Sequence, residues 1–174
     1  MRKMLTCLLA LTLAFPALAA AEALLADGDY RYVLREDGGA EILEFTGSDE
    51  DPLLVIPDTL GGVPVTAVGD EVFAYWHFES VTVPEGVTVL GSRAFCNCYE
   101  LTEILLPESL TVIGDYAFAD CLNLTEIKVP VSVTVLRENA FDRCESLTVL
   151  VQAGSYAEQY CQENGIPCRT VDAE

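Results

Sequence analysis

The chain has 174 residues and a formal net charge of −19, with 28 Asp and Glu against nine Lys and Arg. Such a surface repels phosphate groups, which excludes nucleic acid and anionic lipid as partners. The sequence is 51% hydrophobic and its charges are spread rather than blocked, which excludes an acidic disordered tail and indicates a soluble globule.

Residues 1–21 have the pattern of a secretory signal peptide. Arg2 and Lys3 precede an apolar run that ends at Phe15, and small residues follow. The run is shorter than the roughly 20 apolar residues of a membrane anchor. We expect cleavage before Glu22 and no stable membrane insertion afterwards. The mature chain would be secreted or at the cell surface, with the periplasm as an alternative, and residues 22–174 suffice for one domain.

Residues 27–52 are expected to form an N-terminal cap made of a β-hairpin and a polar loop. Tyr30–Leu34 and Ala40–Phe45 flank Asp37-Gly38, a dipeptide typical of a type I′ turn with positive φ at both central residues. A hairpin here would cover the apolar face and strand edge of the segment that follows. The adjacent acids of the loop lack the spaced ligands and glycine of a calcium site, so we expect no metal there.

Residues 53–151 repeat one motif at an interval of about 23 residues. Leu101–Pro107 and Leu124–Pro130 share the pattern Leu-Thr-Glu-Ile-x-x-Pro. The same interval separates Phe95, Phe118 and Phe141, and also Cys98, Cys121 and Cys144. Repetition at this interval is typical of a solenoid, whose units must stack because none buries its apolar face alone.

Within one unit the spacing of apolar residues predicts which side chains point inward. Ile104 and Leu106 alternate at period two, which indicates a short strand with one buried side that Pro107 ends. At Gly114 we expect a turn that a Cβ would hinder, and at Ala117–Phe118 an irregular or short helical return. The predicted fold is a solenoid of ~23-residue leucine-rich repeats with short stacked β-strands.

The segments Leu101–Cys121 and Leu124–Cys144 resemble the BspA-type (Treponema pallidum-type) bacterial leucine-rich repeat, whose unit ends in Ala-Phe-x-x-Cys. The resemblance covers roughly residues 55–150. It implies a secreted or surface-displayed bacterial solenoid, related to proteins that are similar to adhesins. It implies no catalytic residues and no cofactor.

Tyr75-Trp76-His77-Phe78 is the densest aromatic cluster of the sequence. Trp76 stands in the place of the repeat cysteine and Phe78 in that of the leucine, so we expect both in the core. Tyr75 and His77 are then expected at the surface, where aromatic residues are favoured binding anchors. His77 is the only histidine, and no nucleophile motif accompanies it, which argues against a hydrolase.

Outward residues of stacked strands form columns, because neighbouring strands lie about 4.8 Å apart. The expected columns are Ser80, Glu103, Glu126 and Thr82, Leu105, Lys128. Like charges that face each other across strands are mildly destabilising. The columns are therefore a candidate binding surface for an extracellular protein or peptide, with a basic partner as one option. The alternative is that the acids only keep a repeat surface soluble.

Residues 152–174 are expected to form a C-terminal cap of a helix and a strand. Ser155-x-x-Glu158 is a capping box for a helix over Tyr156–Asn164, which Gly165 would end. The segment after the helix could bring Cys168 to Cys161, and a disulfide between them is one option, free thiols the other. The ladder cysteines are expected to be free, because inward cysteine acts as a small apolar residue.

The sequence thus predicts a secreted, noncatalytic protein-binding or adhesion module that acts as a monomer. Two alternatives stay open. One is a structural spacer or surface-layer component without a specific ligand. The other is a secreted hydrolase, which would need His77 or a carboxylate pair that nothing in the sequence singles out.

Overall fold

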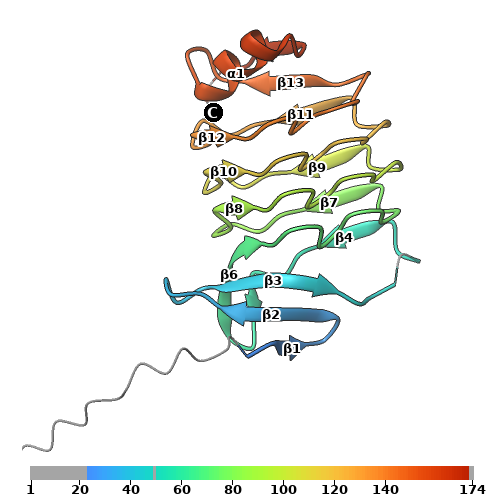
Figure 1. The fold of residues 1–174 in the computed structure, drawn as a ribbon, viewed down its shortest axis with the longest axis vertical. Coiled ribbons are helices and arrows are strands. Elements are labelled where there is room, and N and C mark those ends of the chain that lie inside the picture. The colour runs from blue at the N-terminus through green and yellow to red at the C-terminus, as the bar shows by residue number, and fades with distance from the viewer. Residues whose placement is uncertain (1–22, 49, 173–174) are drawn as a thin grey trace, which may run out of the picture.

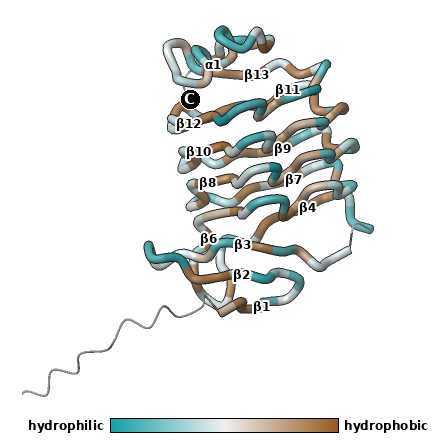
Figure 2. Tube along the Cα trace, in the orientation of Figure 1, coloured by the Kyte–Doolittle hydropathy of each residue, from teal (hydrophilic) through white to brown (hydrophobic). Residues whose placement is uncertain are grey.

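The structure, a computed structural model, describes residues 23–48 and 50–172, so the predicted signal peptide lies outside it. The described residues form a β-solenoid of about six turns with one short C-terminal helix, as the repeats predict (Figure 1). The N-terminal strands lie at one end of the stack and the helix at the other. Hydrophobic and hydrophilic stretches alternate along the turns of the stack (Figure 2).

One side of the solenoid is an eight-stranded sheet in the order β1-β2-β3-β6-β8-β10-β12, with β5 paired to β6. Its strands are β1 (Leu25–Asp27), β2 (Tyr30–Leu34), β3 (Ala40–Phe45), β5 (Thr59–Leu60), β6 (Val63–Val68), β8 (Val89–Leu90), β10 (Val112–Ile113) and β12 (Val135–Leu136). From β6 onward each strand pairs in parallel with the equivalent strand of the next turn. Parallel pairing of equivalent strands is what stacked repeats require.

The other side consists of two three-stranded sheets, β4-β7-β9 and β11-β13-β14. The strands are β4 (Leu53–Val55), β7 (Ser80–Thr82), β9 (Glu103–Leu105), β11 (Glu126–Lys128), β13 (Thr148–Val151) and β14 (Cys168–Thr170). In β7, β9 and β11 the middle residue is buried and its two neighbours are half-buried or exposed, which is the period-two pattern that the sequence predicts.

A ladder of phenylalanine rings runs through the core. Phe73, Phe95, Phe118 and Phe141 stack with centroid separations of 5.3, 5.7 and 5.8 Å and interplanar angles of 11°, 4° and 7°. This confirms the expected alignment of the repeat phenylalanines. The repeat cysteines run alongside: the thiol of Cys121 donates a hydrogen bond to the Phe95 carbonyl at 3.2 Å, and the other two ladder thiols make equivalent bonds.

The returns between the two sides are irregular, and α1 (Tyr156–Asn164) is the one helix that the described residues contain. Two non-glycine residues in each return adopt left-handed backbone conformations, with φ between 55° and 68°. The equivalent residues of successive returns form two columns. They are Glu71, Arg93, Tyr116, Asn139 and Tyr75, Asn97, Asp120, Arg143. Backbone hydrogen bonds to the next turn hold the first three residues of each column, as from the Tyr75 N–H to the Cys96 carbonyl at 2.9 Å. These bonds offset the cost of the conformation.

Gly114 is needed for a reason other than the expected turn. Its φ is not positive, but a Cβ there would lie 2.5 Å from the carbonyl carbon of Gly91 and 2.6 Å from the Ser92 nitrogen. Adjacent turns of backbone therefore approach too closely for any side chain at this position.

The N-terminal hairpin has the predicted strands, but its turn is not type I′. Gly38 has positive φ while Asp37 does not, and the Arg35 N–H bonds to the Gly39 carbonyl at 2.8 Å across a three-residue loop. The Asp37 carboxylate favours this longer loop by accepting from the Gly39 N–H at 2.9 Å. Positive φ at both central residues occurs instead at Gly61-Gly62, between β5 and β6.

The hairpin extends the first sheet, because β3 pairs in parallel with β6. Phe45 packs against Phe73 at 5.5 Å and so covers the first ring of the ladder. The rings of Trp76 and Phe78 also contact Phe45, with centroid separations of 5.0 and 6.0 Å. Phe78 is buried in the core as expected, whereas Trp76 is half-buried and packs against it. The cap thereby buries an apolar end that a solenoid would otherwise expose.

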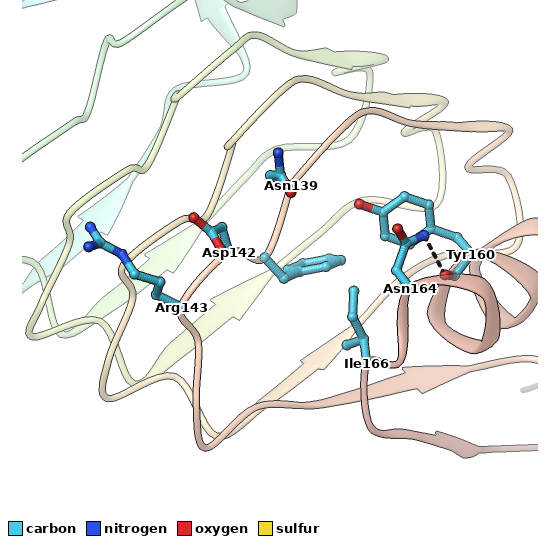
Figure 3. Close-up of a pocket in the computed structure, with 7 residues that line it drawn as sticks. Asn139, Asp142, Arg143, Tyr160, Asn164 and Ile166 are labelled. Carbon is cyan, nitrogen blue, oxygen red and sulfur yellow. Dashed lines mark hydrogen bonds between the residues drawn. The ribbon is translucent and has the colours of Figure 1, made fainter.

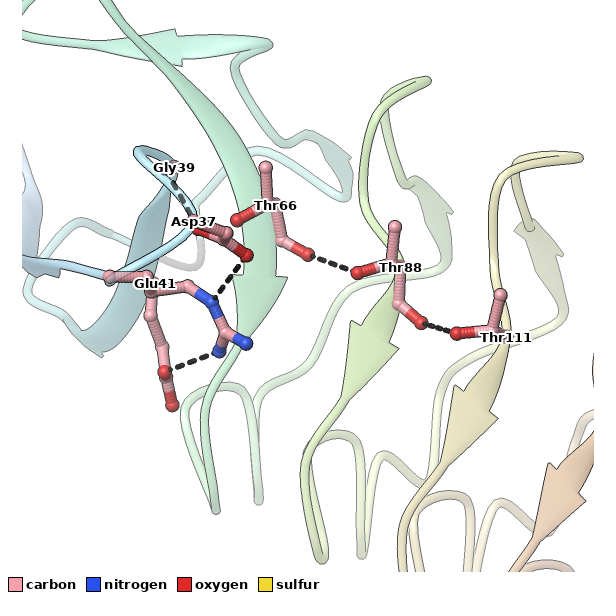
Figure 4. Close-up of polar contacts among 7 residues, drawn as sticks. Asp37, Gly39, Glu41, Thr66, Thr88 and Thr111 are labelled. Carbon is pink, nitrogen blue, oxygen red and sulfur yellow. Dashed lines mark hydrogen bonds and ion pairs between the residues drawn. The ribbon is translucent and has the colours of Figure 1, made fainter.

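A column of threonines follows the first sheet (Figure 4). The Thr111 hydroxyl donates to the Thr88 carbonyl at 3.0 Å, and the Thr88 hydroxyl donates to the Thr66 carbonyl at 3.2 Å. Thr66 is first in the column, where the register of β3 and β6 shifts after Ala40. Its buried hydroxyl has no partner in the described structure, because no regular turn precedes it.

The C-terminal cap follows the predicted pattern. The Ser155 hydroxyl accepts from the Glu158 N–H at 3.2 Å, and Gly165 ends α1 in a left-handed conformation with φ of 67°. The Glu158 carboxylate accepts from the Gly154 N–H at 2.6 Å rather than from Ser155. After the helix, β14 pairs in parallel with β13 and completes the stack.

Candidate binding surface

The outward surface of β4, β7, β9, β11 and β13, here called the strand face, carries six of the eight predicted surface residues. Ser80 and Thr82 lie on β7 and are half-buried. Glu103 and Leu105 lie exposed on β9, and Glu126 and Lys128 lie exposed on β11.

The strand register determines which of these residues are neighbours. Ser80 pairs with Glu103, and Thr82 pairs with Leu105, as the repeat interval predicts. On the N-terminal side the same columns continue to Leu53 and Val55, which are 60% and 69% exposed. The 23-residue interval does not predict these two residues, because 27 residues separate Leu53 from Ser80.

The strand ladder of this face is interrupted between β9 and β11, which belong to separate sheets. A shallow groove of about 350 Å³ lies at the interruption. Glu103 and Leu105 line it from one strand, and Glu126 and Lys128 line it from the other. Four predicted surface residues therefore converge on one concave feature near the middle of the face.

Glu126 and Lys128 of the two columns each form an ion pair. The Arg169 guanidinium lies 2.7 Å from the Glu126 carboxylate, and the Lys128 ammonium lies 3.8 Å from that of Glu108. All four side chains are exposed, so each pair stabilises the fold by about 0–1 kcal/mol. Glu103 is exposed on β9 and lines the groove.

Tyr75 and His77 are exposed as expected, but they do not lie on a strand. Tyr75 is 68% exposed and belongs to a column of left-handed residues on the return. His77 follows in the same return, before β7 begins. The structure thus separates the predicted surface into the strand face and a return surface, because the turn that precedes β7 places these two outside the strand columns.

A second hollow lies at the C-terminal end, between the last turn and α1 (Figure 3). Its volume is about 180 Å³, and Asn139, Asp142, Arg143, Tyr160, Asn164 and Ile166 line it together with Phe141. The Asn164 amide donates to the Tyr160 carbonyl at 2.8 Å, which holds the helix end over the hollow. None of the residues predicted for binding reaches it.

The buried thiols of the cysteine ladder are weakly reactive. Burial raises the pKa of the Cys98 thiol to about 12 and that of the Cys144 thiol to about 11, so both stay protonated and weakly nucleophilic near neutral pH. Within the part of the chain that the structure describes, no group of three or more His, Cys, Asp or Glu side chains could hold a metal.

The two C-terminal cysteines approach each other as the sequence suggests. Cys161 is buried on α1 and Cys168 is half-buried on β14. The pKa of the Cys161 thiol is raised to about 12, mainly by burial and to a smaller extent by the neighbouring Cys168 thiol. Both are free thiols in this structure, and a disulfide between them stays a prediction.

These features define a leucine-rich-repeat solenoid with a capped core and a regular outward strand face. The model of the BspA type leucine rich repeat region matches residues 66–163 in six copies. The chain therefore belongs to the BspA-type leucine-rich repeat family, as the sequence motif predicts. No significant match is found among curated proteins.

Several solved bacterial structures share the fold. A leucine-rich repeat protein from Bacteroides capillosus is 30% identical, with a TM-score of 0.62 over 76% of this chain and 100% of that chain. A leucine rich cell surface protein from Faecalibacterium prausnitzii is 23% identical, with a TM-score of 0.69 over 87% of this chain and 40% of that chain. The T. pallidum leucine rich repeat protein is 25% identical, with a TM-score of 0.58 over 74% of this chain and 71% of that chain.

Among the described residues no helix is long and apolar enough to cross a membrane.

Proposed function

We propose that this protein is a noncatalytic protein-binding module that acts at the bacterial cell surface or outside the cell. The observation that carries the proposal is the groove between β9 and β11, on which Glu103, Leu105, Glu126 and Lys128 converge. Stacked strands present such residues at a fixed spacing and at little entropic cost, because the backbone is already ordered.

The groove favours a partner with a basic and an apolar contact. Glu103 offers an exposed carboxylate that lines the groove, and Leu105 on the same strand is 53% exposed. A lysine or arginine of the partner would meet Glu103, and an apolar side chain would cover Leu105. The extracellular location is supported by the signal-like residues 1–21 and by the relative from F. prausnitzii, which is a cell surface protein.

The test is capture of a partner from an extracellular protein mixture, followed by a saturation measurement with the purified partner. Glu103→Lys combined with Glu126→Lys should abolish saturable binding. A matched control, Glu36→Lys combined with Glu138→Lys, makes the same charge change at exposed sites away from the strand face and should bind normally. If no saturable partner is found, the structural-spacer alternative is favoured, and turnover of a peptide or glycan substrate would favour the hydrolase alternative.

A further inference from the structure

The first strand of the strand face, β4, has one edge that no other strand of the described residues covers. Within residues 23–48 and 50–172 it is the terminal strand of the sheet β4-β7-β9 and pairs with β7 alone. The side chains of Leu53 and Val55 on this strand are 60% and 69% exposed, although both are large and apolar. An open strand edge with exposed apolar side chains is a template for pairing with another extended chain.

The backbone groups that point to the open edge can be assigned from the ladder. The Ser80 N–H bonds to the Pro52 carbonyl at 3.1 Å, and the Ile56 N–H bonds to the Thr82 carbonyl at 3.0 Å. Because backbone groups alternate in direction along a strand, those of Leu53 and Val55 point away from β7. The Leu53 N–H is held by the Asp51 carboxylate at 2.9 Å. The Leu53 carbonyl and the Val55 N–H and carbonyl face the edge.

A groove of about 400 Å³ adjoins this edge. Tyr30 and Phe45 of the N-terminal hairpin line it together with Leu53 and Val55, which gives the groove an aromatic and aliphatic wall. Three carboxylates, those of Asp29, Glu50 and Asp51, also line it, and no Lys or Arg does. An extended segment beside β4 would place alternate side chains against the aromatic wall and near the carboxylates.

The charges decide which kind of segment fits. A second copy of this chain, with a net charge of −19, would bring acids against acids. We propose that β4 binds an extended, lysine-bearing segment of a partner protein by strand addition, with apolar side chains in the groove and lysines on its carboxylates. This site is separate from the groove between β9 and β11, so the inference stands independently of the proposed function.

The probe is a fluorescent eight-residue peptide of alternating lysine and valine, whose binding to the full chain is followed by anisotropy. Two comparison peptides separate the contributions of charge and of backbone hydrogen bonds. The first replaces lysine by glutamate. The second carries N-methyl groups on alternate amides, which removes the backbone donors on one of its edges. The methylated peptide loses its two hydrogen bonds to the Leu53 and Val55 carbonyls, so it should bind at least about tenfold more weakly. The glutamate peptide should not bind measurably.

Val55→Pro tests the edge on the protein side, because it removes the N–H that faces the partner and alters no buried side chain. It should weaken binding at least about fivefold. Val55→Thr keeps the N–H at the same position and is the comparison, which should retain clearly more affinity than Val55→Pro. Circular dichroism checks that each variant is folded, and if Val55→Pro does not fold, the methylated peptide decides alone.

Three results would overturn the proposal. One is equal binding of the methylated and unmethylated peptides. Another is sedimentation that shows a dimer of this chain which Val55→Pro abolishes. The third is peptide binding lost in Glu103→Lys with Glu126→Lys but kept in Val55→Pro, which would assign the peptide to the groove between β9 and β11.

Discussion

Removal of one ring from the phenylalanine ladder tests the packing on which the fold depends. Phe118 is 0% exposed and stacks on both sides, at 5.7 Å from Phe95 and 5.8 Å from Phe141. Phe118→Ala should lower the free energy of unfolding by about 3–5 kcal/mol, because the ring leaves a cavity that two flanking turns cannot fill. That is a large part of the roughly 5–15 kcal/mol that stabilises a typical domain.

Urea unfolding followed by far-UV circular dichroism measures this loss. Phe118→Leu is the matched control: it keeps most of the apolar volume and should cost about 1–3 kcal/mol. Combining it with Phe95→Leu measures the stacking itself, which should appear as a coupling energy of about 0.5–1.5 kcal/mol. Two results would refute the ladder as a source of stability. One is a loss of less than about 1.5 kcal/mol of unfolding free energy in Phe118→Ala. The other is a double leucine variant whose loss equals the sum of the losses in the two single variants.

Three further predictions concern stability. Gly114→Ala should lower the unfolding free energy by about 2 kcal/mol or more in urea titrations, because its Cβ would overlap the backbone of the adjacent turn. Oxidation should join Cys161 to Cys168 and stabilise the chain by about 2 kcal/mol; mass spectrometry and urea unfolding with and without reductant should show this, and Cys168→Ser should remove the difference. The pKa of Cys98 is raised from 9.0 to about 12, so the folded state holds its proton more tightly than the unfolded state. The contribution of this thiol to the free energy of unfolding is fully present below about pH 9. Between about pH 9 and pH 12 the free energy of unfolding falls by about 1.4 kcal/mol per pH unit for each such buried thiol. Cys98→Ala should make that decline shallower, and an unchanged slope would contradict the assignment.

The candidate surface was only partly predictable from the sequence. The repeat interval gave the columns through Glu103 and Leu105, because equivalent residues of equal-length turns must align. The repeat interval does not predict Leu53 and Val55, because the longer first turn places them 27 residues before their partners on β7. No repeat pattern signals the interruption between β9 and β11, which depends on how two particular turns pack.

The sequence by itself determined the solenoid, its inward residues and the helix over Tyr156–Asn164, because each follows from local spacing: a period of two, an interval of 23 and a capping box. Only the tertiary structure decided the reason for Gly114 and the open edge of β4. These depend on atoms from different turns, whose distances are fixed when the turns stack and not by residues adjacent in the chain.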